Sequence, residues 1–203
     1  MTITFWTNPM SRGRIVRWML EELGQPYDTV VLAYGPEMKS PDYLAVNPMG
    51  KVPAIRHDGR VVTEAAAICA YLAEAFPQAG LQGQDRAAFF RWLFFAAGPV
   101  EQAVTLKSLG VTVPAEREGT VGFGTLPHVL DALETAVSAH PYIAGEAFSA
   151  ADVYVGSQIG WGMMFGTIEP RPALVAYWDR LKDRPARLRA DEMDNALMPK
   201  KEG

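Results

Sequence analysis

Only a few residues in this chain have types and spacing that suit chemistry. The single cysteine, Cys69, cannot form an internal disulfide or a CxxC redox pair. The three histidines are scattered without the spacing of metal ligands, so we expect no metal site. Ser11 stands directly before a predicted helix, in a loop that also contains Asn8. A hydroxyl in that place can donate a hydrogen bond to an anion, or it can simply cap the helix.

The elements that must position this loop alternate between strand and helix. Residues 2–7 and 27–32 are rich in aromatic and β-branched types, which favours two strands. The apolar spacing over residues 12–24 predicts a helix that stops at Gly24. Because a helix separates the two strands, we expect them to be parallel.

Two further strands and a helix follow a loop over residues 34–47. Residues 52–57 and 60–63 flank an Asp-Gly dipeptide, which predicts an antiparallel hairpin. Residues 64–76 form an alanine-rich stretch with helical spacing. The predicted order is therefore β-α-β-β-β-α, one α/β sheet domain.

The composition changes after residue 76. Residues 77–84 (PQAGLQGQ) are typical of a linker. Helical periodicity then recurs in four stretches, at residues 85–109, 125–139, 149–165 and 172–183. We predict an α/β domain over residues 1–76 and an all-helical bundle over residues 85–203.

Bulk properties exclude several classes of protein. A net charge of -4 gives no electrostatic reason to bind nucleic acid. The richest apolar run, residues 89–100, is interrupted by Arg91 and is too short to span a membrane. The N-terminus lacks the pattern of a signal peptide. With one cysteine, these features predict a protein of the reducing cytoplasm.

Two motifs carry a resemblance to a known family. Residues 47–53 (NPMGKVP), followed by Thr63-Glu64 and a helix, resemble the glutathione transferase family. Residues 144–152 (AGEAFSAAD) look like the helical-domain motif of the same family. In the second motif Ser149 and Asp152 have the spacing of a capping box, so it supports the fold rather than catalysis.

The resemblance implies a fold and an activity. It implies a thioredoxin-like first domain, and a helical second domain that contributes the pocket for an electrophile. The implied enzyme conjugates the thiolate of glutathione, its co-substrate, to small apolar electrophiles without a metal. Residues 11–14 (SRGR) resemble the bacterial serine-type members.

The resemblance also assigns glutathione-binding residues. Val52 pairs its main chain with the cysteinyl part of glutathione, and Pro53 follows through a cis bond. Glu64 helps to hold the γ-glutamyl group, and Lys51 meets the glycyl carboxylate. Where the family usually has serine or threonine, this chain has Ala65, whose main-chain amide remains available at a helix N-terminus.

Activation of the thiol has three candidates. The free thiol has a pKa of about 8.5, so the enzyme must stabilise the anion. Ser11 is the first candidate donor to the sulfur, and Asn8 is the second. A main-chain amide of residues 10–12 is the third.

Assembly and a different function class are also open. The aromatic stripe over residues 89–95 and the resemblance predict a homodimer, in which Glu101 contacts glutathione across the interface. The alternative function is a non-catalytic binding or regulatory module on the same scaffold. A glutathione-dependent disulfide reductase would need a cysteine near residue 10, and this chain has none there.

Overall fold

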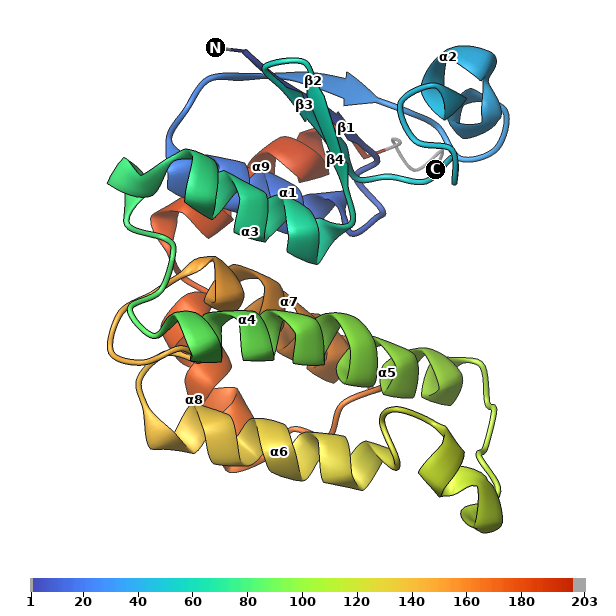
Figure 1. Cartoon of the computed structure of the whole chain (residues 1–203), viewed down its shortest axis with the longest axis vertical. Coiled ribbons are helices and arrows are strands. Elements are labelled where there is room, and N and C mark those ends of the chain that lie inside the picture. The colour runs from blue at the N-terminus through green and yellow to red at the C-terminus, as the bar shows by residue number, and fades with distance from the viewer. Residues whose placement is uncertain (1, 199–203) are drawn as a thin grey trace. The chain divides into compact units, whose positions relative to one another are not determined.

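The computed structural model describes residues 2–198, which form two compact units (Figure 1). In this range, residues 2–80 and 184–198 make up the first unit, and Leu81–Asp183 makes up the second. Within residues 2–198 no helix has the length and apolar character that a membrane span requires.

The first unit contains one four-stranded sheet. Its strands are β1 (Ile3–Thr7), β2 (Tyr27–Val31), β3 (Ala54–His57) and β4 (Arg60–Thr63), arranged in the order β2-β1-β3-β4. Strands β1 and β2 are parallel, and β3 is antiparallel to both β1 and β4. The predicted parallel pair and the predicted hairpin are therefore confirmed.

Helices α1 (Gly13–Leu23) and α3 (Ala65–Ala75) lie on the same side of the sheet (Figure 1). Their apolar faces make the core of the first unit together with the sheet. Large side chains that are almost fully buried there include those of Ile3, Phe5, Ile15, Met19, Ile55, Ile68 and Leu72. The order of elements and the mixed sheet confirm the thioredoxin-like fold.

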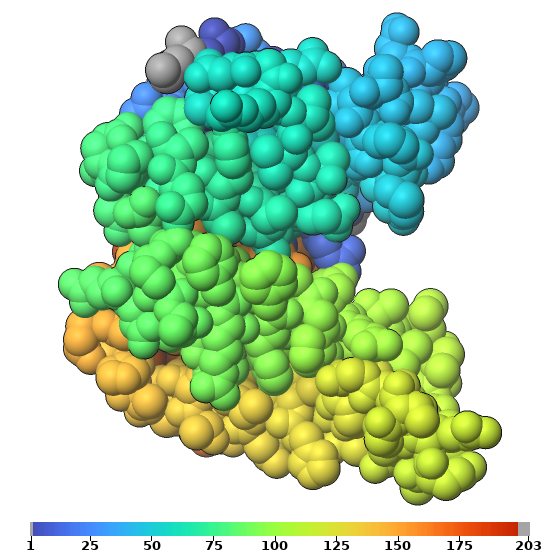
Figure 2. Space-filling model, viewed as in Figure 1, coloured from blue at the N-terminus to red at the C-terminus, as the bar shows by residue number. Residues whose placement is uncertain are grey.

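The segment predicted as a loop over residues 34–47 contains two short helical turns. A 3₁₀ turn spans Glu37–Lys39, and α2 spans Pro41–Leu44. The Ser40 hydroxyl oxygen caps α2 by accepting from the Tyr43 main chain at 3.3 Å. Figure 2 shows this segment as a lobe on the outside of the first unit. A single helical turn is too short to produce an apolar period, so the sequence indicated only a loop.

A final helix, α9 (Pro185–Ala196), was not predicted. It packs against α1 and belongs to the first unit. The predicted helical domain extended over residues 85–203, so the structure differs from that boundary at its C-terminal end. The tertiary partner of α9 is the sheet domain.

The second unit consists of helices, as expected. They are α4 (Arg86–Phe95), α5 (Glu101–Ser108), α6 (Leu126–Ala139), α7 (Ala150–Met164) and α8 (Pro172–Leu181), with 3₁₀ turns at Pro77–Ala79 before the unit and Ala115–Thr120 within it. The helix predicted over residues 85–109 is divided by a π turn, Ala96–Val100, which contains Pro99. Proline has no main-chain N–H, so the regular helical ladder cannot continue through it.

Helix α7 is largely buried and begins with the predicted capping box. The Asp152 carboxylate accepts from the Ser149 N–H and hydroxyl, both at 2.9 Å. Its other oxygen accepts from the Ile143 N–H and the Tyr177 hydroxyl, both at 2.8 Å. Burial nevertheless raises the pKa of Asp152, while these four hydrogen bonds oppose the rise. Asp152 therefore has a structural role in joining α7 to α8.

Candidate active site

The register of the sheet brings the predicted site segments to the same end of its strands. In the pairing, Trp6 lies opposite Ala54, and Ala54 lies opposite Thr63. The chain leaves β1 directly after Trp6 and Thr7, enters β3 at Ala54 and leaves β4 at Thr63. The loop with Ser11, the Val52–Pro53 pair and Glu64 consequently start from the same end of the sheet.

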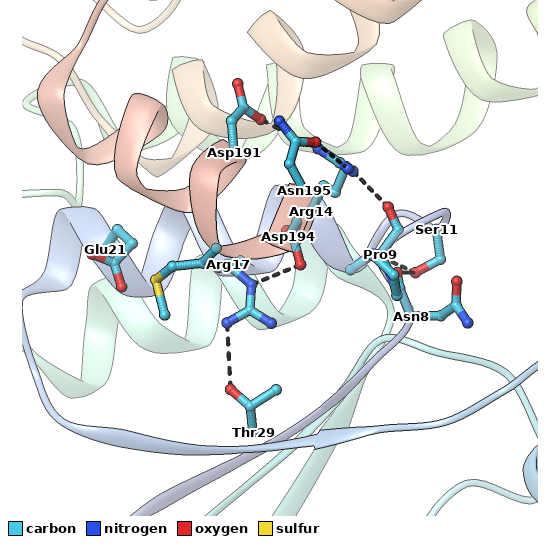
Figure 3. Close-up of polar contacts among 12 residues, drawn as sticks. Asn8, Pro9, Ser11, Arg14, Arg17, Glu21, Thr29, Asp191, Asp194 and Asn195 are labelled. Carbon is cyan, nitrogen blue, oxygen red and sulfur yellow. Dashed lines mark hydrogen bonds and ion pairs between the residues drawn. The ribbon is translucent and has the colours of Figure 1, made fainter. Parts of the chain in front are cut away.

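The loop after β1 is closed by its own hydrogen bonds (Figure 3). The Ser11 hydroxyl donates to the Asn8 carbonyl at 2.7 Å and accepts from the Gly13 N–H at 2.9 Å. The Ser11 N–H also donates to the Asn8 carbonyl, at 3.0 Å. Ser11 is partly exposed at the start of α1, where the helix dipole favours an anion.

Asn8 is more deeply placed than Ser11. Its side chain donates to the Leu32 carbonyl at 2.8 Å, and its side-chain oxygen accepts from the Met10 N–H at 2.9 Å. Asn8 is 6 % exposed. It therefore joins the loop to the end of β2, and the Met10 and Ser11 amides are both used within the loop.

The segment before β3 is held by side chains from the α2 region. The Tyr43 hydroxyl and the Asn47 side chain both donate to the Lys51 carbonyl, at 2.6 and 2.7 Å. Burial raises the pKa of Tyr43 to about 12, so its hydroxyl stays a donor. Lys39 donates to the carbonyls of Met49 and Gly50 at 2.8 and 2.9 Å.

The Val52–Pro53 peptide bond is cis, as expected from the resemblance. Pro53 is buried and Val52 is partly exposed, while the Lys51 side chain extends into solvent. Within residues 2–198, the main-chain N–H and C=O of Val52 have no hydrogen-bonding partner. A main-chain donor and acceptor are thus free to pair with an extended peptide.

The start of α3 is open in a similar way. Glu64 precedes the helix with φ of +66° and ψ of 118°, a conformation that non-glycine residues rarely adopt. Its exposed side chain does not cap the helix. The first amides of α3, which begins at Ala65, are therefore not satisfied by a capping side chain and suit a carboxylate.

Two further residues named from the sequence lie elsewhere. Glu101, in the second unit, accepts from the Gln158 side chain at 2.7 Å within the same chain. Cys69 is fully buried in α3, and burial raises the pKa of its thiol to about 12. Cys69 is therefore an inert packing residue.

Sequence reasoning missed most of the residues that support this site. Lys39 gave no signal beyond being a lysine in a predicted loop. From the sequence, Arg14 was either a support of the first-helix loop or a surface residue, and its Nε donates to the Pro9 carbonyl at 2.6 Å. Its further partners lie in α9, and they could not be identified from the sequence because α9 itself was not predicted.

Comparison with known proteins gives matches over both units. The family model for the glutathione S-transferase N-terminal domain matches residues 10–75, and that for the C-terminal domain matches residues 114–185. The "Glutathione S-transferase GST-4.5" of Xanthomonas campestris is 32% identical over 156 residues, which cover 71% of this chain and 76% of that protein. "Glutathione S-transferase A" of Pleuronectes platessa is 26% identical over 92% of this chain and 88% of that protein.

Solved structures are also similar over nearly the whole chain. A glutathione transferase from Methylococcus capsulatus has a TM-score of 0.77 and 27% identity, over 96% of this chain and 99% of that one. A sphingomonad glutathione S-transferase complexed with glutathione has a TM-score of 0.75 and 29% identity, over 95% of this chain and 98% of that one.

Proposed function

The chain belongs to the glutathione S-transferase family, and from that premise we propose how the segments at this end of its sheet bind and activate glutathione. The activity is that of a glutathione transferase, with glutathione as co-substrate. The residue roles that follow are proposals.

Main-chain pairing at Val52 carries the proposal. A tripeptide laid along this segment gains two hydrogen bonds from a donor and an acceptor that the fold leaves unused. The γ-glutamyl carboxylate then meets the open amides of α3 at Ala65, with Glu64 beside its amine. Lys51, which is exposed on the same segment, is the proposed partner of the glycyl carboxylate.

The thiol of a tripeptide held in this way faces the loop after β1. We assign Ser11 as the first candidate donor to the thiolate, in the manner of serine-type members. Lowering the thiol pKa by about two units requires about 2.7 kcal/mol of preferential interaction with the anion. The Ser11 hydroxyl must exchange its bond with the Asn8 carbonyl for one with sulfur, and the dipole of α1 assists. Asn8 and a main-chain amide of the loop stay the alternatives.

Assembly and location belong to the same proposal. Phe94 on α4 is 73% exposed and Phe90 is 40% exposed, whereas Phe89 and Trp92 are buried in the helical unit. Two exposed phenylalanines one turn apart suit a homodimer interface. A contact of Glu101 with glutathione bound to the second subunit is part of this proposal. The second substrate is a small apolar electrophile, bound by the helical domain, and the location is the cytoplasm.

One experiment separates the enzyme from a binding module. The protein is passed over glutathione resin, eluted with glutathione and assayed with chlorodinitrobenzene. Retention with turnover supports the proposal, and retention without turnover of a panel of electrophiles supports the non-catalytic alternative. Absence of retention contradicts the glutathione site.

A further inference from the structure

We propose that Arg14 and Asn195 form a positioning clamp, through which the C-terminal helix α9 fixes the shape of the loop that carries Ser11. The inference rests on the proposed function for its catalytic consequence, but the clamp itself is a property of the fold. It gives α9 a role in the active site, although this helix is far from the loop in sequence.

The clamp consists of one guanidinium with partners on two elements (Figure 3). Arg14 Nε donates to the Pro9 carbonyl at 2.6 Å, and Nη2 donates to the Asn195 side-chain oxygen at 2.8 Å. The remaining nitrogen, Nη1, lies 3.7 Å from an Asp191 carboxylate oxygen. Arg14 thus joins the loop to α9 directly.

Helix α9 is held against α1 by several hydrogen-bonded ion pairs between side chains. Arg17 Nε and Asp194 Oδ1 are 2.8 Å apart, and both side chains are at most 1 % exposed. Arg184 makes two hydrogen bonds to Glu22, at 2.6 and 2.8 Å. A side chain held by α9 is therefore held relative to α1.

The carbonyl that Arg14 holds, that of Pro9, lies within the loop that carries Ser11. Pro9 lies between Asn8, which is tied to β2, and Ser11, whose hydroxyl is bonded to the Asn8 carbonyl. The loop is consequently fixed on one side by Asn8 and on the other by Arg14. An arginine side chain has many rotamers, and its order depends on the partners that hold its far end. Losing Asn195 should release Arg14, and with it the Pro9 side of the loop.

Arginine is suited to this role and lysine is not. A planar guanidinium can hold a carbonyl with Nε and a second acceptor with Nη2 at the same time. A single ammonium cannot reproduce that geometry. Arg14→Lys should therefore resemble Asn195→Ala, whereas Asn195→Asp keeps an acceptor oxygen and should resemble the wild type.

The test compares Asn195→Ala, Asn195→Asp and a matched control, Arg189→Ala. Arg189 pairs with Glu21 at 3.1 Å, so the control removes a contact between α9 and α1 that does not reach the loop. Hydrogen exchange of the Met10 and Ser11 amides is measured first. We expect exchange to be about three- to tenfold faster in Asn195→Ala, the effect of losing one ordinary hydrogen bond. It should be unchanged in Asn195→Asp and Arg189→Ala.

The second readout is the pH–rate profile of conjugation, with the affinity for S-methylglutathione as a check on binding. In Asn195→Ala the profile should move to higher pH and kcat should fall at neutral pH, while affinity changes less than about twofold. Equal loop exchange in Asn195→Ala and wild type, or an equal increase in Arg189→Ala, would overturn the clamp. Faster loop exchange with an unmoved profile would overturn its role in positioning Ser11. If the wild type does not conjugate glutathione, the proposed function fails, and the exchange data still decide whether the clamp exists.

Discussion

The Ser11 hydroxyl donates to the main-chain carbonyl of Asn8 at 2.7 Å, so these two candidate thiolate donors are parts of one hydrogen-bonded loop. Asn8 is buried and uses both the nitrogen and the oxygen of its side-chain amide to hold that loop. Ser11 is the more exposed of the two and lies at the start of α1. Of the two side chains, Ser11 is therefore the one that can turn to a ligand while its main-chain N–H keeps the bond to the Asn8 carbonyl.

Substitution of Ser11 by alanine should slow conjugation at neutral pH. Without the hydroxyl, the pKa of the bound thiol should rise by about one unit, the effect of losing one hydrogen bond to an anion. The deficit should shrink at higher pH, where the thiolate forms without assistance. A pH–rate profile of both proteins measures the shift. An unshifted profile would reject Ser11 and direct attention to Asn8 and the loop amides.

Substitution of Ala65 by serine should tighten glutathione binding. The residue is the first of α3, where a hydroxyl would add one hydrogen bond to the γ-glutamyl carboxylate. We expect binding to be about tenfold tighter by calorimetric titration. Ala70→Ser places the same hydroxyl later on the same helix and should leave the affinity unchanged. Unchanged affinity in Ala65→Ser would mean that the main-chain amides already satisfy the carboxylate.

Substitution of Asp152 by alanine should destabilise the helical unit without a specific effect on chemistry. Four buried donors lose their acceptor, so we expect a loss of at least about 3 kcal/mol of unfolding free energy. Denaturant unfolding measures it. A variant that unfolds normally but does not turn over would contradict the structural assignment.

The same carboxyl gives a pH dependence of stability. Because burial raises its folded-state pKa, the folded protein binds this proton more tightly than the unfolded chain does. The contribution of Asp152 to stability therefore declines as the pH rises from the unfolded pKa through the folded one. Asp152→Asn has no proton to release, so its unfolding free energy should lack this part of the dependence on pH.

Substitution of Phe94 by glutamate should dissociate the proposed homodimer. Phe94 is 73% exposed, and a charge there cannot be buried without a partner. Phe165 is 72% exposed at the end of α7, so Phe165→Glu is a control with the same change in charge and similar exposure. Sedimentation at micromolar concentration should show monomers for Phe94→Glu alone. A wild-type monomer, or dimers in both variants, would contradict the interface.

Much of the fold was predictable because its apolar residues follow clear periods. The strands and the helices over residues 13–23 and 65–75 were identified from spacing and turn residues, and the two motifs indicated the family. Helix α9 was missed because its sequence, PARLRADEMDNA, has almost no apolar period. Its buried positions are Ala186, Ala190 and Asp194, two small residues and an acid at a spacing of four. Only the tertiary pairing of Asp194 with Arg17 shows why that face is buried.

The candidate site was predictable to a similar extent. Val52, Pro53 and Glu64 were named from a motif, and sheet register explains why they converge. Lys39 and Asn195 support the site through side chains that bond to distant segments. Such pairings depend on tertiary structure and leave no local pattern in the sequence.

The most direct test of the account is the pKa of the glutathione thiol on the enzyme. Ultraviolet difference titration of the thiolate in the wild-type complex measures it without reference to any electrophile. We predict a value about two units below that of free glutathione, with Ser11→Ala returning part of the way towards the free value. A bound thiol that titrates like free glutathione would contradict the claim that the segments at this end of the sheet, with the loop after β1, activate glutathione.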